Sequence, residues 1–233
     1  MSLNTAKYVI EKAYVDASKL PRGGVPTPTQ YLDGLDRLND IINLEQTQGL
    51  RLWLEHEYEL TLVASQQLYS FMPGGDAAMT RPMRVKQATY RGTSGNLRPL
   101  TMLSREEWSR LANRDQEGSV NSFFPEKLAD RLNLHLWNVP DTSAAGGKVL
   151  VVLHKQATNP TYISEGTGFP PEWVIYLRWA LAADLATGMP EAVIIRAQNN
   201  AAIAKAALDG WDVEDGSTYF QPSHQAAPPS RFA

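Results

Sequence analysis

Apolar residues recur at helical spacing in two stretches near the start of the chain. Between residues 6 and 17 they fall on one face and charged residues fill the other, which predicts an amphipathic helix. The sequence Thr27-Pro-Thr-Gln30 is typical of a capping box, with a threonine cap, a proline in the first turn and a glutamine that reaches back to the cap. It predicts a second helix, whose apolar stripe covers residues 32–44 and which ends at Gly49.

A second pair of helices is predicted towards the other end of the chain. Residues 170 and 171 are both proline, which fits a helix entry because the missing N–H groups have no partner there. Apolar side chains then recur at helical spacing over residues 173–185, and Gly188 suits the left-handed residue that ends a helix. A further helix begins at Pro190 and keeps the same period to Leu208. So short a connection predicts two antiparallel helices that pack together.

Between the two helix pairs the period changes from helical to alternating. From residue 50 to residue 62 the even positions are apolar apart from His56, and the odd positions are mostly polar. This alternation predicts a long strand with one buried and one solvated face. A short helix is expected over residues 104–111, with Ser104 as its cap and Glu107 three residues on. Further strands, separated by turns rich in glycine and proline, are predicted at residues 68–71, 83–85, 97–103, 132–137 and 148–153.

The order of these elements predicts an α+β fold. The N- and C-terminal helix pairs, residues 1–49 and 169–211, form a four-helix bundle, and residues 50–168 form an inserted antiparallel β-sandwich domain. After Trp211 the chain has three prolines, little periodicity and too few apolar residues to hold a place in a core. Residues 212–233 are therefore expected to form an extended C-terminal tail.

Composition narrows the class of protein further. Hydrophobic residues make up 43% and charged residues 20% of the 233-residue chain, which is ordinary for a soluble globular protein. The net charge of -3 and the isoelectric point near 5.8 argue against a dedicated nucleic-acid binder, although a local basic surface stays open. The absence of cysteine excludes disulfides, thiolate zinc sites and cysteine nucleophiles. The start has no signal-peptide pattern and the chain no long apolar run, so we expect a cytoplasmic protein without a membrane span.

The strand at residues 50–62 carries the residues closest to a catalytic or metal-binding pattern. His56 does not match a zinc-protease motif, which needs two histidines four residues apart on a helix. The alternation places His56 on the apolar face, so a core histidine is predicted. Glu55, Glu57 and Glu59 share the other face, where they could bind a cation or shift one another's pKa, although a solvated or partner-facing edge is favoured. With no nucleophile elbow, P-loop or dinucleotide-binding turn, the sequence predicts no catalytic, cofactor or metal residues.

A run of positive charge follows within the predicted β-domain. Six cationic residues occur there without an intervening aspartate or glutamate. Such a set can face the phosphates of DNA, but a solvated sheet face or a contact between subunits is favoured. The six are Arg81, Arg84, Lys86, Arg91, Arg98 and Arg105.

Three segments, in their order along the chain, carry a resemblance to a known family. The first leads directly into the alternating strand. The second is matched together with two later segments, and the third is a helix entry. They are residues 35–53 with Tyr69, residues 98–108 with 121–125 and 134–141, and Phe169-Pro-Pro-Glu-Trp173. Over about residues 3–211 the chain resembles the head-to-tail adaptor family of tailed bacteriophages. That family includes the tail tubular protein A and packaged-DNA-stabilisation types of short-tailed phages.

The resemblance implies a structural protein rather than an enzyme. It implies a homo-oligomeric ring, typically a dodecamer, docked under the portal protein at the head–tail junction of the virion and assembled in the host cytoplasm. Such a ring extends the channel for double-stranded DNA without sequence specificity, helps to retain the packaged genome, and is a platform for the tail nozzle or the next tail protein. It requires no cofactor and no membrane.

The tail that begins at Asp212 is the candidate for portal docking. In the family the C-terminal segment often reaches the portal, and this chain matches by position only. Aromatic and arginine side chains dominate the energy of protein interfaces, so the expected anchors are Tyr219, Phe220, Arg231 and Phe232.

A ring needs contacts between unlike faces of neighbouring subunits, and the basic region and the Glu55, Glu57 and Glu59 strand are candidates for those faces.

Two further interpretations stay open beside the head-to-tail adaptor. A connector or completion protein of a long-tailed phage would differ only in what binds below it. The least favoured alternative is a β-domain hydrolase that uses Glu55, Glu57 or His56.

Overall fold

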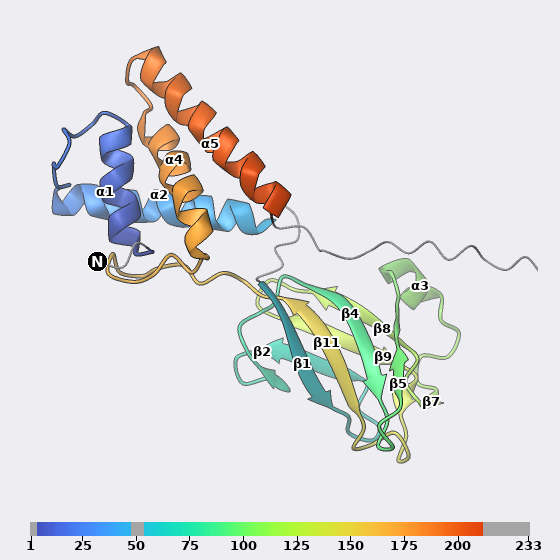
Figure 1. The fold of residues 1–233 in the computed structure, drawn as a ribbon. Coiled ribbons are helices and arrows are strands. Elements are labelled where there is room, and N and C mark those ends of the chain that lie inside the picture. The colour runs from blue at the N-terminus through green and yellow to red at the C-terminus, as the bar shows by residue number, and fades with distance from the viewer. Residues whose placement is uncertain (1–3, 48–53, 212–233) are drawn as a thin grey trace, which may run out of the picture.

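The computed structural model describes residues 4–47 and 54–211, without the side chain of Trp211. Within these ranges the protein is a mixture of α-helices and mainly antiparallel sheets, so the predicted α+β class is confirmed. Helices from both ends of the chain lie together on one side, and the strands between them form the other side (Figure 1). We call these two regions the helical part and the strand part.

The first two helices begin where the sequence predicts. α1 (Ala6–Asp16) is capped by Thr5, whose side chain accepts a hydrogen bond from the backbone of Tyr8. α2 (Pro28–Thr47) opens with the predicted capping box. The amide of Thr27 donates to the side chain of Gln30 over 2.8 Å, and the amide of Gln30 donates back to Thr27 over 3.3 Å. The predicted end at Gly49 lies outside the described residues.

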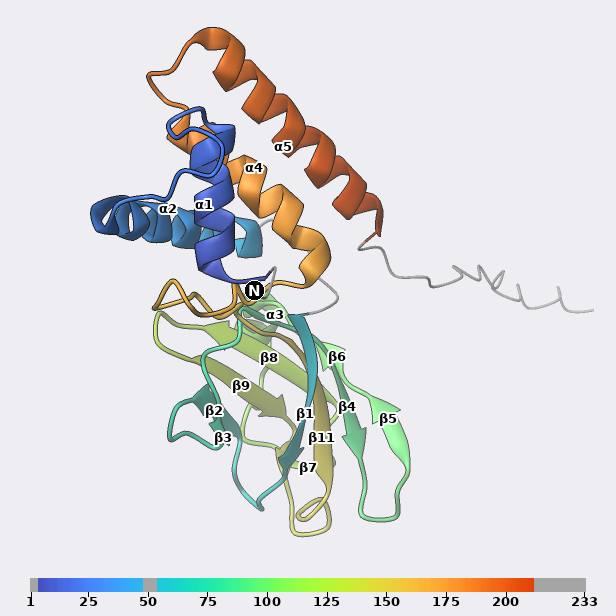
Figure 2. The same ribbon diagram turned by 60° about the vertical axis from the view of Figure 1, so that its left-hand side comes forward.

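The C-terminal helix pair also follows the sequence pattern. A single turn, η2 (Pro171–Trp173), leads into α4 (Val174–Leu185), and α5 (Glu191–Trp211) follows after Gly188. Gly188 has a φ of 84°, the left-handed conformation that glycine adopts without strain. α4 and α5 run antiparallel, and α5 lies at the outside of the helical part (Figures 1 and 2).

The helical part has one hydrophobic core. α1, α2 and α4 supply most of its buried side chains, whereas α5 buries only Ala197 and Leu208 among its described residues. The returning segment before α4 also belongs to it, because Ala157 and Phe169 are buried in the same core. The amide of Ala157 donates to the side chain of Gln46 over 3.1 Å. Ala157, which precedes the predicted boundary at residue 169, thus packs in the core of the helices.

The strand part is built on two sheets. One is antiparallel throughout, in the order β1 (Glu55–Thr61), β11 (Lys148–His154), β4 (Arg84–Arg91) and β5 (Leu97–Pro99). The other has antiparallel central pairs and short parallel edges, in the order β3 (Ala77–Ala78), β2 (Leu68–Met72), β9 (Leu132–Trp137), β8 (Ser122–Lys127) and β6 (Thr101–Met102). A separate parallel pair joins β7 (Glu117–Gly118) to β10 (Val139–Pro140), and α3 (Arg105–Arg110) is the predicted short helix with its capping box.

Both sheets contribute to a second hydrophobic core. Val149 and Val151 of β11 are fully buried in it, as are Leu134 and Leu136 of β9. The ring of Phe71 meets that of Tyr58 edge to face, with centroids 5.8 Å apart. The alternation at β1 therefore identifies the buried face correctly at Tyr58 and the residues after it.

The prediction of a core histidine at position 56 is wrong. His56 is exposed, although it has the same parity on β1 as Tyr58. β1 is the edge strand of its sheet, and the side chains near its start project beyond the buried core. Alternation indicates which face a side chain takes, but not how far the core extends along the strand. Among the described histidines, His154 at the end of β11 is the fully buried one.

Two other strand predictions need correction. Residues 97–103 were expected to form one strand, but the chain crosses between sheets at Leu100, so β5 and β6 lie in different sheets. β8 was missed, because Pro125 lies within it and proline disfavours a strand assignment. Residues 50–53 of the long predicted strand lie outside the described residues.

Candidate interaction surfaces

The exposed face of the four-stranded sheet brings the predicted acidic and basic residues together. Lys86 of β4 pairs with Glu55 of β1 over 2.8 Å, and both side chains are about three-quarters buried, with 25% and 22% exposed. Arg91 of β4 pairs with Glu59 of β1 over 2.8 Å, and Lys148 of β11 contacts the same carboxylate. Because β11 lies between β1 and β4, the two sets meet across it.

The strand glutamates and the basic residues are therefore not two separate surfaces. Hydrogen bonds from Lys148 and Arg91 stabilise the charged form of Glu59 and lower the pKa of its carboxyl group. Glu57 is exposed and has no ion pair within the described residues. Glu55 and Glu59 thus have cationic partners within one subunit, and their expected role in a contact between subunits stays a prediction.

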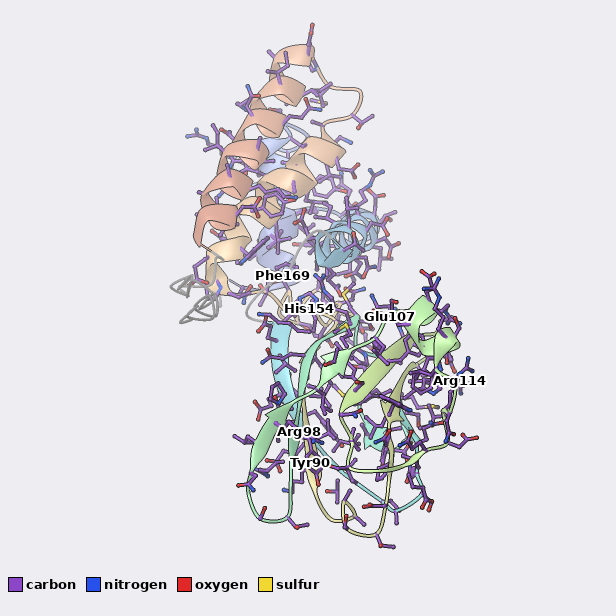
Figure 3. All side chains as sticks on the ribbon, turned by 90° about the vertical axis from the view of Figure 1, so that its right-hand side faces the viewer. Tyr90, Arg98, Glu107, Arg114, His154 and Phe169 are labelled. Atoms are coloured by element: carbon purple, nitrogen blue, oxygen red, sulfur yellow. The ribbon has the colours of Figure 1, made fainter. Side chains whose placement is uncertain are left out.

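The other cations of the predicted basic set also contact groups of the same subunit. Arg81 donates to the carbonyl of Leu128 over 3.1 Å, and Arg84 is likewise engaged by a neighbouring group. Arg98 lies over the ring of Tyr90, 5.5 Å from its centroid, at the end of the strand part away from the helices (Figure 3). Arg98 also donates to Ser119 over 2.9 Å and to the carbonyl of Val120, while Arg105 pairs with Glu126 over 3.1 Å.

Three of the six cations, Lys86, Arg91 and Arg105, pair with carboxylates, which reduces the net charge that the strand part can offer to DNA. The six cations come from several strands and loops, and each has a partner within the same subunit. Electrostatic binding of DNA depends on cations that neutralise phosphates. A role of these residues in the DNA channel or in a subunit contact stays a prediction.

Four cavities in the described residues are lined by residues other than Glu55, His56 and Glu57, the groups named for the hydrolase alternative. Within residues 4–47 and 54–211, no group of three or more histidines, aspartates and glutamates is placed to hold a metal ion.

A network around α3 escaped the sequence analysis. The ring of Trp108 stacks on Phe124 of β8 with centroids 5.7 Å apart, and it lies 5.3 Å from the ring of His135 on β9. Glu126 accepts hydrogen bonds from Asn133 and His135, which lower the pKa of its carboxyl group. Because β8 was not predicted, no local pattern indicated that Trp108 would pack α3 against this sheet.

The helical part has a cavity with a basic rim, which we call the basic cavity. It has a volume of about 580 Å³ and lies between the end of α1, the following loop and the start of α5. Arg196 donates to the backbone carbonyl of Asp16 over 2.7 Å, and the carboxylate of Asp16 pairs with Arg178 over 2.7 Å. Burial raises the pKa of Asp16, and Arg178 opposes that shift. The cavity is lined by Val15, Asp16, Ser18, Lys19, Leu20, Pro21, Arg22, Trp179 and Arg196.

A second hollow, which we call the acidic groove, lies along α2. Its volume is about 430 Å³. Arg37 bridges Asp33 and Asp184 over 2.9 and 2.7 Å, and these two hydrogen bonds raise the pKa of Arg37, so its charge is permanent. The groove is lined by Asp33, Asp36, Arg37, Asp40, Ile41, Leu44 and Asp184.

A third hollow is almost wholly apolar. It has a volume of about 540 Å³ and lies between the first turns of α2 and the segment before η2. Leu32 and Tyr162 line it and are exposed.

The predicted anchors of the C-terminal tail cannot be placed among these surfaces. Tyr219, Phe220, Arg231 and Phe232 lie outside the described residues.

In the part of the chain that the structure describes, every helix is too short or too polar to cross a membrane. No protein-family model and no curated protein sequence matches the chain.

Proposed function

We propose that this chain is a structural head-to-tail adaptor of a phage virion. In this proposal the four long helices are the predicted bundle and the two sheets are the inserted β-sandwich. Copies form a ring below the portal protein, which extends the channel for double-stranded DNA, helps to retain the packaged genome and gives the tail nozzle a platform.

The observation that carries the proposal is the nesting of the two parts. α1 and α2 share one core with α4, although the whole strand part lies between them in sequence. This is the arrangement that the resemblance implies. Two of the segments that carry it also meet in space, since the amide of Leu103 donates to the carbonyl of Phe123 over 2.8 Å.

The outer helix supports a role in assembly. α5 lies at the outside of the helical part (Figure 2), and Ile195 and Ile203 on this helix are 47% and 68% exposed. Exposed apolar residues on a helix at the molecular surface suit contact with another protein. α5 also leads directly into the tail that we expect to dock on the portal.

The decisive experiment combines the chain with the portal protein of the same phage. Electron microscopy of the mixture should show a ring of this chain on the portal. A chain truncated after Trp211 should melt at the same temperature as the full chain but fail to join the portal in sedimentation. The full chain failing to sediment with its portal would reject the proposed function.

A finer version tests the aromatic anchors of the tail. Tyr219→Ala with Phe220→Ala should weaken joining to the portal, because large aromatic side chains carry much of the energy of an interface. Ser217→Ala with Thr218→Ala is the matched control in the same tail and should join normally. If both double variants join equally well, these aromatic residues are not the anchors.

A further inference from the structure

Two surfaces of the helical part carry opposite charges that are left without partners. Lys19 and Arg22 are exposed at the basic cavity, in the loop between α1 and α2. Asp36 and Asp40 are exposed in the acidic groove, one helical turn apart on α2. None of these four side chains has a hydrogen bond or an ion pair within residues 4–47 and 54–211.

Each surface combines its charge with apolar groups. Leu44 follows Asp40 by one turn in the acidic groove and is 58% exposed. The basic cavity has the ring of Trp179 and the side chain of Leu20 in its wall. Moving an exposed leucine side chain out of water lowers the free energy, and a concave wall that contains a tryptophan can accommodate it. Protein interfaces commonly have such an apolar centre inside a polar rim.

The basic cavity and the acidic groove are two different surfaces of the same chain. The linings of the basic cavity and the acidic groove share no residue. A contact that joins two different surfaces of the same chain repeats from copy to copy, and it gives a closed ring when the rotation between neighbours closes.

We propose that copies of this chain associate head to tail, with the acidic groove of one copy against the basic cavity of the next. Asp36 and Asp40 face Lys19 and Arg22 of the neighbour, and Leu44 enters the wall beside Trp179. Complementary charges select the correct partner and speed its approach. The inference rests on the ring of the proposed function and names the contact that builds it.

Two charge-reversed variants of the full chain test the contact. The first carries Asp36→Arg and Asp40→Arg, so that both of its surfaces are basic. The second carries Lys19→Glu and Arg22→Glu, so that both of its surfaces are acidic. All four positions are exposed, and circular dichroism melts should match those of the parent. Self-association is measured by sedimentation velocity at low ionic strength, up to about 1 mM, because we expect a weak contact in the absence of the portal.

Each variant alone should associate at least about tenfold more weakly than the parent, because like charges then face each other. The equimolar mixture should regain the association of the parent, since every acidic surface of one variant can meet a basic surface of the other. Recovery in the mixture cannot come from repaired folding, because neither protein changes on mixing. Added salt should weaken the parent and the mixture alike.

A matched control has the same charge change elsewhere. Asp115→Arg with Asp130→Arg adds the same charge as the first variant, at exposed positions in the strand part, and should associate like the parent. The inference is overturned if the mixture stays as weak as each variant alone, or if the parent does not self-associate up to the highest concentration. It is also overturned if Lys19→Glu with Arg22→Glu loses binding to double-stranded DNA while self-association is unchanged, because the basic cavity would then face phosphate.

Failure of this inference differs from failure of the proposed function. Joining to the portal is measured separately, with the same variants. If the mixture recovers self-association but the parent never joins a portal, the contact stands and the adaptor function falls. If the parent forms a ring on the portal and both variants do so equally well alone, the adaptor function stands and this contact falls.

Discussion

The strand part and the helical part differ in where some of their exposed charges find partners. On the four-stranded sheet, Glu55 and Glu59 meet cations of the same subunit across β11. In the helical part, Asp36 and Asp40 lie on one surface and their potential partners on another. The difference shows that the number of charges in a segment says little about the charge it can offer a partner. Which strands are neighbours, and which helix faces are covered, decides that.

The largest expected effect tests whether the two cores are independent. Trp173 is 2% exposed and packs on Phe169 and Tyr176, with ring centroids 5.5 and 5.8 Å away. Trp173→Ala should lower the free energy of unfolding by about 3–5 kcal/mol, because it leaves a large cavity in the helical core. Hydrogen exchange should speed up in the helices while the strand amides stay protected. Ile175→Ala, at a position 59% exposed, is the control and should change little. Equal loss of protection in both parts would show that they unfold as one unit.

The next effect concerns Glu45, a buried carboxylate with partners inside the helical part. Glu45 is 2% exposed and accepts hydrogen bonds from Tyr176 over 2.5 Å and from Lys205 over 2.7 Å. Glu45→Ala should cost about 3 kcal/mol of unfolding free energy, because it leaves a partly buried ammonium group without this carboxylate. Glu45→Gln keeps an acceptor and should cost less. Thermal melts that place the two substitutions in the opposite order would contradict this role for Glu45.

A smaller effect is expected at the start of α2. Thr27→Ala removes the acceptor of the Gln30 amide and should cost about 1 kcal/mol of stability. Thr29→Ala changes an exposed neighbour in the first turn and is the control. In urea denaturation, Thr27→Ala should lower the free energy of unfolding much less than Trp173→Ala does. A larger loss at Thr27 than at Trp173 would contradict the assignment of the helical core.

The smallest expected effect is the pH dependence of folding stability, which differs between the two parts. Hydrogen bonds, chiefly from side chains, lower the pKa values of Glu126 and Asp141 in the strand part, so their stabilisation is present above the unfolded pKa and is lost as the pH falls through the folded pKa. In the helical part, burial and a hydrogen bond to Glu11 raise the pKa of Tyr31 from 10.0 to about 12. Its stabilisation is present below pH 10.0 and is lost as the pH rises towards about 12.

Acid should therefore loosen the strand part first, whereas alkali should act on both parts, because burial also raises the pKa of Tyr69 in the strand part. Nuclear magnetic resonance spectra recorded across both ranges can follow the two sets of amides separately. Tyr31→Phe should reduce the alkaline loss of stability in the helical part and should leave the acid order unchanged. If both parts lose their signals together in acid, these groups do not distinguish them.

Local signals in the sequence were enough to predict the helices. Their limits depend on neighbouring residues, such as the Thr27 and Gln30 box and the left-handed Gly188, which act within one turn. Strand pairing depends on residues far apart in sequence, so the change of sheet at Leu100 and the presence of β8 were not predicted. His56 was misplaced because alternation carries no information about the length of the core.

The candidate surfaces were harder to predict than the fold. The pairing of Glu59 with Arg91 requires β11 to lie between β1 and β4, which no local pattern indicates. Asp36 and Asp40 are ordinary polar positions of an amphipathic helix in the sequence. Their lack of partners depends on which faces of α2 the other helices cover, and only the assembled structure gives that information.

The contact between the two ends of the helical part has a consequence for the order in which the protein folds during synthesis. The side chain of Asn4 donates to the carbonyl of Phe169 over 2.7 Å, across a separation of 165 residues. On the ribosome, α1 and α2 are made first, yet α4, which completes their core, is made after the whole strand part. The strand part can therefore fold while the first helices still lack their partner. Once folded, it brings the two halves of the helical part close together and lowers the entropy cost of joining them.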